Sequence, residues 1–495
     1  MSVETTHPLY TEFSPLWELC RDSIAGQQKI KSRREAYLPR PSGANDDKYN
    51  AYLMRAVYSS FTTRTADGLY GQVFSKEPVI EGNDTELGEA LIKNVDGKGT
   101  SLVKFASELV WDTLPTHRSL ILVDYSAARE GMDILEVKRE GLRPVMIWYS
   151  AENITNWAYD IVNDKKTLVM VVLKEGYSVQ GKDEFTPVSK TRYRVLKMKD
   201  VPEKGFIYVQ EIWEKSEDDK KEWYKANEIK PEMQGKNLDF IPVFMLPADE
   251  PEESMLLPIA HLNIGHYQLM ADYRNIIHLT CTPTMFGINV RLPLDPTDEK
   301  KEKLATIKMG GDVFNAIEST NEHTPSIFYL ESTGTGASSS IVAIEDTKKD
   351  IEIMGGDLIK PQKKGVETAE AARIHKSNEI SILGAFILSV SEEVTKAVRL
   401  ALKWYGVAET EADKFEIKLN MDYEGELSLE GRIRQDSLLV DSDLMSTRRF
   451  LTQTLSMTDE EAEAEMAQID KEKRGVFAEE PEEPLEEPPV NEGEE

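Results

Sequence analysis

The sequence predicts an α+β fold in which helices surround a β-rich unit. Apolar residues recur at spacings of three and four, the period of a helix, in several segments, most clearly in 258–280. From Pro144 to about Val243 apolar and polar residues instead alternate, as they do in strands. Turn signals at 163–164, Gly176 and 204–205 divide this part into runs, which predicts an antiparallel sheet.

The segment 258–280 reads as one long helix. Pro258 fits a first helical turn, where its missing N–H is not needed, and Pro283 stops the helix. Charged and polar residues interrupt the segment, so it does not read as a membrane span. Its apolar seam needs either the core of a large domain or a neighbouring helix. The seam consists of Ile259, Leu262, His266, Leu269, Tyr273, Ile276 and Thr280.

The part before the β-rich unit is mainly helical in pattern. The basic stretch Lys29–Arg34 favours a solvated helix end over a nucleic-acid contact, and Tyr37–Gly43 is a Pro/Gly loop. Helical spacing continues from Tyr49 to Phe61, and Gly68 and Gly71 are expected to break that helix. The other expected elements are helices at Leu16–Ile30, Glu86–Ile92 and Leu102–Leu114 and a buried strand at Ser119–Tyr125. The tryptophans of the β-rich unit favour core or sheet-face positions over a stacking platform for bases.

A second helix is expected at 338–355, after a mixed excursion of short strands at 284–330. Serines at its start offer N-caps. The same spacing of three and four then recurs, which predicts a seam like that of the first long helix. This second seam consists of Ile341, Ile344, Lys348, Ile351 and Gly355.

The chain after this helix is expected to form a basic loop and a very long helix. The loop carries three cations, Lys360, Lys363 and Lys364. Glu367–Tyr405 then predicts one helix of 39 residues, with Gly406 as its stop. A strand at 415–423 and helices at 427–439 and 447–455 are expected to follow.

The composition indicates an acidic protein, with a formal net charge of −29. The end of the chain, 459–495, holds 16 acidic and 3 basic residues with many prolines, which predicts disorder. So acidic a chain is a poor match for a protein that grips nucleic acid through many cations, although it permits a polyanion to pass. Two cysteines, no signal peptide and no long apolar run indicate a cytosolic product without a disulfide framework.

The sequence contains no recognisable catalytic or ligand-binding motif. Gly334–Gly336 lacks the following Gly-Lys-Ser/Thr of a phosphate loop and fails the Rossmann spacing at Ser339. His261 and His266 diverge by about 140° around a helix, so they do not share a metal-ligand face. No nucleophile signature such as G-x-S-x-G occurs. We therefore expect no enzymatic activity, no cofactor and no metal site.

Several segments together resemble the portal proteins of tailed bacteriophages and prophages. They are YLPRPSG at 37–43, Y-x-x-Y-L-x-R-A at 49–56, R-T-x-x-G-L-x-G-x-V-F at 64–74, ENITNW at 152–157 and HLNIGHYQLMADY at 261–273. The resemblance covers roughly residues 10–455 and is specific in combination, although each segment alone is weak. The acidic tail departs from any family pattern.

The resemblance implies a portal-like fold whose subunits assemble as a ring, usually of twelve, around double-stranded DNA. The implied parts are a wing at 1–257 with its β-rich unit at 144–250, stem helices at 258–283 and 338–355, a clip at 284–337, a tunnel loop at 356–366, a long helix and return strand of the wing at 367–425, a crown at 426–457 and an acidic tail at 458–495. The implied location is the capsid vertex of a virion, after assembly in the host cytoplasm. Implied partners are terminase, head-completion (adaptor), scaffold and major capsid proteins, and no membrane.

The resemblance also implies two sets of functional residues. Lys360, Lys363 and Lys364 would give brief phosphate contacts in the tunnel. The stem would meet neighbouring subunits through Leu262, His266, Leu269, Tyr273, Ile341, Ile344 and Ile351. Two alternatives remain open: another head–tail connector or scaffold-binding protein without a DNA channel, and an NTP-using enzyme, which the missing phosphate cradle disfavours.

Overall fold

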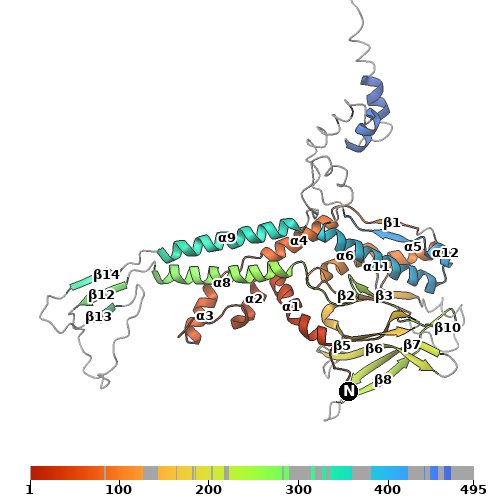
Figure 1. Cartoon of the computed structure of the whole chain (residues 1–495), viewed down its shortest axis with the longest axis horizontal. Coiled ribbons are helices and arrows are strands. Elements are labelled where there is room, and N and C mark those ends of the chain that lie inside the picture. Colours follow the sequence, from red (N-terminus) through yellow and green to blue (C-terminus); the bar gives the residue numbers. More distant parts are fainter. Residues whose placement is uncertain are drawn as a thin grey trace, which may run out of the picture. The chain divides into compact units, whose positions relative to one another are not determined.

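The structure is a computed structural model, and it divides into two units, 1–423 and 424–495. It mixes helices with open sheets, so the predicted α+β class is confirmed (Figure 1). The residues that it describes are 2–82, 85–125, 143–162, 164–180, 183, 185–201, 205–216, 222–280, 284–288, 314–317, 326–330, 335–358, 381–421, 437, 440, 446–454 and 462–469.

The chain begins with a set of helices whose breaks differ from those expected. The predicted helix Leu16–Ile30 is interrupted at Gly26, which has a φ of 84° and separates the first two helices. The prediction that Gly68 and Gly71 break a helix is wrong, because both lie inside α4 and the break comes earlier, between Arg55 and Phe61. The elements are α1 (Pro8–Ala25), α2 (Gln27–Ser32), the 3₁₀ turn η1 (Arg34–Ala36), α3 (Asp46–Arg55) and α4 (Phe61–Val73).

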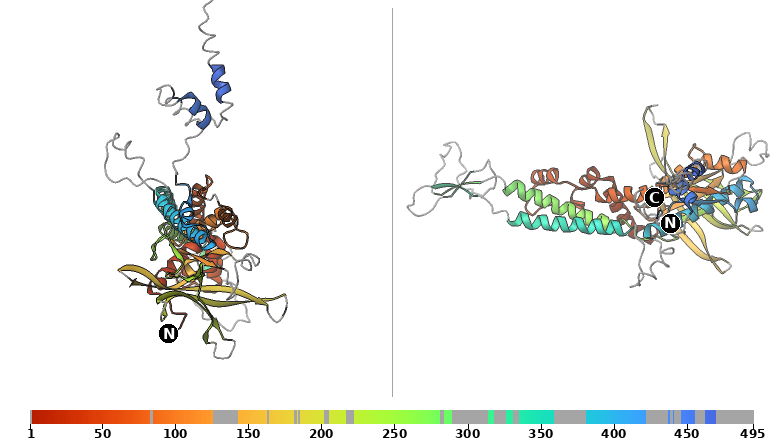
Figure 2. Two further views of the ribbon diagram at one scale, coloured as in Figure 1. Left: turned by 90° about the vertical axis from the view of Figure 1, so that its right-hand side faces the viewer. Right: turned by 90° about the horizontal axis from the view of Figure 1, so that it is seen from above.

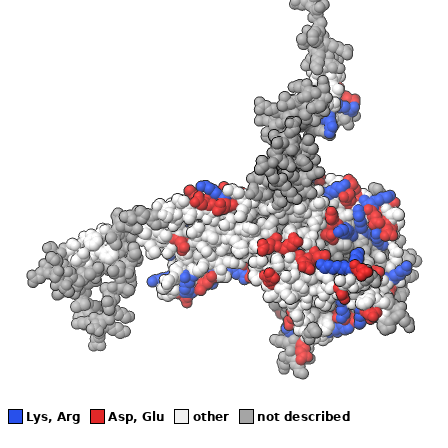
Figure 3. All heavy atoms as spheres, viewed as in Figure 1, with Lys and Arg blue, Asp and Glu red and all other residues white. Residues whose placement is uncertain are grey.

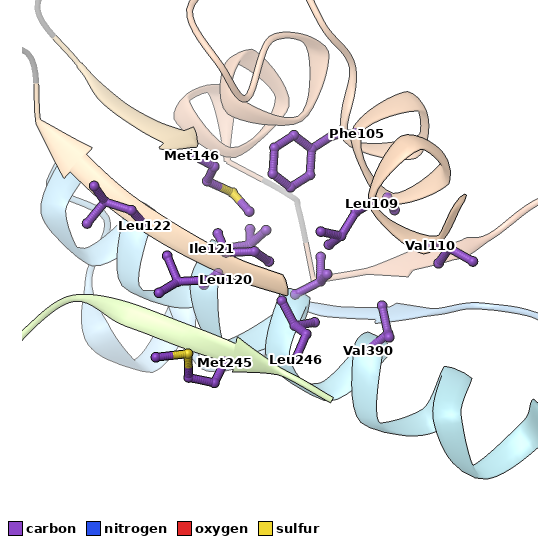
Figure 4. Packing of buried hydrophobic residues seen from close by; sticks show 14 of the residues in the cluster. Phe105, Leu109, Val110, Leu120, Ile121, Leu122, Met146, Met245, Leu246 and Val390 are labelled. Carbon is purple, nitrogen blue, oxygen red and sulfur yellow. The ribbon is translucent and has the colours of Figure 1, made fainter. Parts of the chain in front are cut away.

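The main core of the first unit forms around a three-stranded sheet of order β11-β2-β3. The central strand β2 is buried at every position from Ser119 to Val123, so both of its faces are covered. Side chains of α6 and α11 surround this strand (Figure 4). The elements are α5 (Glu86–Lys93), α6 (Leu102–Thr113), β2 (Ser119–Tyr125), β3 (Pro144–Ser150), β11 (Val243–Leu246) and α11 (Ile382–Tyr405).

The expected antiparallel sheet is confirmed as a five-stranded sheet of order β4-β5-β6-β7-β8. The expected turn at Gly176 is wrong, since Gly176 lies inside β5 and pairs with Thr191 of β6. The strands are β4 (Ile154–Val162), β5 (Lys165–Gln180), β6 (Pro187–Val201), β7 (Gly205–Lys215) and β8 (Trp223–Ile229). A 3₁₀ turn precedes this sheet and a small hairpin follows it: η2 (Ala151–Asn153), β9 (Glu232–Met233) and β10 (Lys236–Asn237).

Two long helices, α8 (Leu257–Thr280) and α9 (Thr335–Asp357), lie side by side (Figures 1 and 2). Both helices were predicted, and each observed end lies within three residues of the expected one. Between them in the chain is a three-stranded sheet, in which the first strand pairs parallel with the second and antiparallel with the third. Its strands are β12 (Thr284–Ile288), β13 (Phe314–Ile317) and β14 (Ser326–Leu330).

The predicted helix Glu367–Tyr405 is interrupted at Ser381, and α11 begins at Ile382, whereas residues 367–380 lie outside the described residues. Ser381 has an extended backbone, and its side chain accepts a hydrogen bond from the N–H of Gly384, which is the geometry of an N-cap. Gly406 ends the helix in the left-handed conformation, as expected. The short elements of this region are α12 (Glu409–Ala412), β15 (Glu416–Lys418) and β1 (Val79–Glu81), and the last two pair with each other.

The second unit is described only in part. Its described helical turns are α14 (Thr447–Arg449), the π-helical turn η3 (Phe450–Thr454) and a helix at 462–469. The first two agree with the helix expected at 447–455. Most of the helix expected at 427–439, and the acidic tail beyond 469, lie outside the described residues.

A buried polar network joins the two larger sheets of the first unit. Glu175 of β5 accepts hydrogen bonds from Tyr149 of β3 at 2.6 Å and from Arg192 at 2.6 Å. Arg194 donates to Glu175 and to Asp124 of β2, both at 2.8 Å. Burial opposes ionisation of Glu175, but the charge of Arg194 and the hydrogen bonds outweigh it, so the pKa of this carboxyl lies below its usual value.

We expect Glu175→Gln to lower the free energy of unfolding by about 3 kcal/mol near neutral pH, because it removes the carboxylate from buried cations. A carboxyl with a depressed pKa stabilises the fold above its unfolded-state pKa. The difference between wild type and variant should therefore shrink as the pH falls below 4.5. Urea unfolding followed by circular dichroism measures both effects. Glu77→Gln, at an exposed position, is the control, and an equal loss in both variants would contradict the role of the network.

Candidate assembly surface on the α8–α9 helix pair

One side of α8 is buried by the N-terminal helices. Leu257 and Ala260 pack with Cys20 of α1, and Tyr267 and Ala271 pack with the tyrosines around α3. Burial raises the pKa of the Cys20 thiol to about 12. This cysteine is therefore a protonated core residue with no nucleophilic character.

A stripe of polar side chains on α8 hydrogen-bonds to the segment 37–55. Gln268, Asp272 and Asn275 are spaced by four and three residues, so they share one face of the helix. Each of them bonds to a different residue of the N-terminal part. The pairs are Gln268 Nε2 with the carbonyl of Tyr37 (2.9 Å), Tyr52 Oη with Asp272 Oδ1 (2.6 Å) and an Arg55 Nη with Asn275 Oδ1 (2.9 Å).

These bonds bring together three of the sequence segments on which the portal resemblance rests. YLPRPSG at 37–43 and Y-x-x-Y-L-x-R-A at 49–56 both dock on or beside the segment 261–273 of α8. Sequence reasoning missed this contact because it followed only the apolar seam. The polar spacing of Gln268, Asp272 and Asn275 was the signal that could have revealed it.

Asn263 is a further buried polar anchor of α8. Its side chain is fully buried and donates to the hydroxyls of Tyr58 and Thr62, the latter at 3.1 Å. Its Oδ1 has no partner among the described residues, so the two bonds of its Nδ2 are the polar link between α8 and the start of α4.

His266 lies inside its own chain, which corrects the expectation that it meets a neighbouring subunit. It is 2% exposed and packs edge-to-face on Phe61, with ring centroids 5.0 Å apart. Burial and the charge of Lys348 lower the pKa of His266, so the ring is neutral at pH 7. Its Nδ1 has no hydrogen-bond partner among the described residues.

The inward face of α9 repeats every seven residues. Its buried positions are Ala337, Ile344, Ile351 and Leu358, the last just beyond the end of the helix. A strict heptad spacing is typical of two helices packed along a coiled-coil seam. The predicted α9 seam was therefore right at Ile344 and Ile351. It was wrong at Ile341, which is 39% exposed, and at Lys348, which is exposed and forms an ion pair with Glu352 at 3.6 Å.

The outward face of α9 exposes large apolar side chains. Val342 is 58% exposed and Ile353 59% exposed, and their spacing of eleven residues places them on one stripe. Ile341 and Met354 beside them are also exposed. Much of the surface over α8 and α9 in Figure 3 belongs to uncharged residues, and the charged residues of α9 gather in one patch. The outward face of α9 thus exposes apolar side chains on both sides of the charged residues Asp346 and Lys349, and exposed apolar area of this kind is the candidate surface for association.

The β12–β14 sheet also exposes apolar residues on both of its faces. Ile327, Phe328 and Tyr329 are consecutive in β14 and each is at least 43% exposed. Because side chains alternate across a strand, these three cover both faces. Phe328 stacks on Phe286 of β12 with ring centroids 6.1 Å apart.

The residues predicted to form the subunit interface and the tunnel differ from one another in their burial. Leu262, Leu269 and Tyr273 are half-buried on α8, and Ile341 is exposed. Assigning Ile344 and Ile351 to a subunit interface is wrong in the same way as for His266, because their own chain buries them. Lys360, Lys363 and Lys364 lie outside the described residues.

Neither a candidate metal site nor a candidate membrane span occurs in the described part of the chain. It contains no cluster of three or more His, Cys, Asp or Glu side chains that could hold a metal ion. None of its helices has the length and apolar character that crossing a membrane requires.

Residues 255–405, from the start of α8 to the end of α11, match a family model described as a domain of unknown function (DUF4055). No curated protein matches the chain. Solved structures that are similar to it include two from a gene transfer agent particle. One is a chain from the virion of a native gene transfer agent particle, with 10% identity and a TM-score of 0.33, covering 86% of this chain and 98% of that one. The other is from the neck of an empty particle of that agent, with 11% identity and a TM-score of 0.35, covering 85% and 98%. TM-scores of this size establish neither a common fold nor a common function.

We expect His266→Gln to make the protein less sensitive to mild acid. The folded state holds His266 neutral, whereas the unfolded chain takes up a proton near pH 6.5, so folding stability falls as the pH drops through that value. The variant should lose less stability than wild type between about pH 7 and pH 5.5. Thermal unfolding at a series of pH values measures this. His261→Gln, exposed on the same helix, should behave as wild type, and identical pH profiles for all three proteins would contradict the prediction.

Proposed function

We propose that this chain is the subunit of a phage portal: a ring at the capsid vertex through which double-stranded DNA is packaged and ejected. The observation that carries the proposal is the α8–α9 pair, whose outward stripe on α9 and whose intervening β12–β14 sheet expose apolar side chains. Copies of one subunit in a closed ring would cover such surfaces. The order of the elements and the motifs at 37–43, 49–56 and 261–273 support the portal class.

In this proposal the protein has no chemistry of its own, and a separate motor drives the DNA. The charge of the chain supports a conduit, because an acidic surface does not retain a polyanion. The three lysines of the segment 356–366 supply the local exception, where brief phosphate contacts would slow or hold the DNA. Terminase, head-completion, scaffold and capsid proteins are the expected partners, and the virion is the expected location.

Electron microscopy of the purified full-length protein tests the assembly. We expect negative-stain images to show rings with a central hole. A species that stays monomeric or dimeric at micromolar concentration would overturn the proposal. Rings whose hole is narrower than duplex DNA, about 20 Å, would instead support a connector without a channel.

The outward stripe of α9 offers a sharper test of the ring. We expect Val342→Asp combined with Ile353→Asp to abolish rings, because two charges would enter each contact between copies where apolar burial contributes about 1–2 kcal/mol per side chain. Both positions are more than half exposed, so the subunit should still fold. Sedimentation velocity measures the loss of the ring. Val103→Asp, an exposed position in the first turn of α6, is the matched control, and rings that survive the double variant would contradict the assigned surface.

The lysines of the tunnel segment give a functional test. We expect replacement of Lys360, Lys363 and Lys364 by Ala to leave rings intact and to reduce the packaged or retained DNA several-fold, because phosphate contacts are lost at one level of the channel. DNA per particle measures this in an assembly reaction. The control replaces the exposed residues Lys93, Lys98 and Lys104 by Ala. If wild type, the triple variant and the control package equal amounts of DNA per particle, the segment is only a linker.

A further inference from the structure

A groove of about 590 Å³ lies on the five-stranded sheet, far along the chain from the helix pair. It is lined by Glu4 of the N-terminal arm and by Trp223, the first residue of β8. Three of its lining residues are lysines, three are aromatic and one is acidic. The lining residues are Glu4, Lys174, Tyr177, Lys190, Thr191, Tyr193, Lys215, Ser216 and Trp223.

The cations of this groove differ from those elsewhere on the same sheet. Lys197 and Lys225 both pair with Glu211, at 2.7 and 3.5 Å. Lys174 and Lys215, which line the groove, form no ion pair within the described part of the chain. Among the described residues no carboxylate pairs with these two cations, so the groove presents positive charge in a protein with net charge −29.

The aromatic side chains make one wall of the groove. Tyr193 meets Trp223 edge-to-face with ring centroids 4.8 Å apart, and the Lys215 ammonium lies 5.3 Å from the Trp223 ring centroid. The indole N–H of Trp223 has no hydrogen-bond partner among the described residues. The wall therefore offers apolar area and cations together.

The N-terminal arm places an apolar residue and an acidic residue, both in a turn, on this face. Val3 packs against the cluster of Val172, Tyr193 and Val195, and the next residue, Glu4, lines the groove. The arm is held further along, where the Asn156 amide donates to the Thr5 carbonyl at 2.9 Å. The face thus accepts an apolar side chain beside a carboxylate.

We propose that this groove binds an extended acidic peptide of a partner protein, in which apolar residues alternate with Glu or Asp. The carboxylates would pair with Lys174 and Lys215, and the apolar side chains would lie against Tyr193 and Trp223. Single-stranded nucleic acid fits less well. Tyr193 covers Trp223 edge-on instead of offering a second stacking face, the lining has no arginine, and Glu4 would repel phosphates.

Fluorescence anisotropy with labelled peptides and the full-length protein tests this proposal. The probe is a peptide of about twelve residues that alternates Glu and Val, long enough to span roughly 40 Å when extended. We expect it to bind with an affinity that falls with added salt, and we expect the same peptide with Gln in place of Glu to bind at least several-fold more weakly. Absence of saturable binding by the acidic peptide would overturn the proposal.

Reversing the charge of the groove lysines tests whether the peptide binds in the groove. We expect Lys174→Glu combined with Lys215→Glu to weaken binding roughly tenfold, as two exposed ion pairs become repulsive. Lys165→Glu is the matched control: it is exposed on the same strand β5, about 30 Å away along the strand. Circular dichroism and thermal unfolding verify that the variants fold. Equal weakening by the control would overturn the assigned groove, and tighter binding of an oligothymidylate of the same length would replace the peptide by nucleic acid as its occupant.

Discussion

The polar contacts of α8 set the arrangement of the subunit's first half. The buried Asn263 and the more exposed Gln268, Asp272 and Asn275 each bond to a residue of the N-terminal part. Apolar packing alone would tolerate a sliding or rotated helix, whereas a buried amide or carboxylate left without its partner costs about 1–3 kcal/mol. With α8 fixed in this way, one of its remaining faces is left for α9.

The two faces of the α9 helix then lie in different environments. Its heptad positions, such as Ile344 and Ile351, are covered by the same subunit. Its outward stripe, such as Val342 and Ile353, is not covered, and neither are the apolar residues of β14. A monomer gains nothing from exposing these side chains, which is why association of copies is the physical basis of the proposed function.

The pairing of cations with carboxylates differs between parts of the molecule. Most cations of the described sheets are paired, as in the network of Glu175 with Arg192 and Arg194. The lysines of the groove, Lys174 and Lys215, depart from this pattern. In a strongly acidic chain, cations without partners are the places where anionic groups can bind, so the peptide groove and the tunnel lysines are separate consequences of one charge balance.

The sequence by itself determined the elements with strong local signals. β2, α8, α9 and the α+β class were all predicted, because apolar periodicity is a property of the segment alone. Contacts between distant segments could not be predicted from the sequence. The cap at Ser381, the strand through Gly176 and the burial of His266 depend on partners that periodicity does not identify. Only the tertiary structure decided which face of α9 is inside, because the apolar residues Ile341 and Ile344 look alike in sequence and differ only in what lies against them.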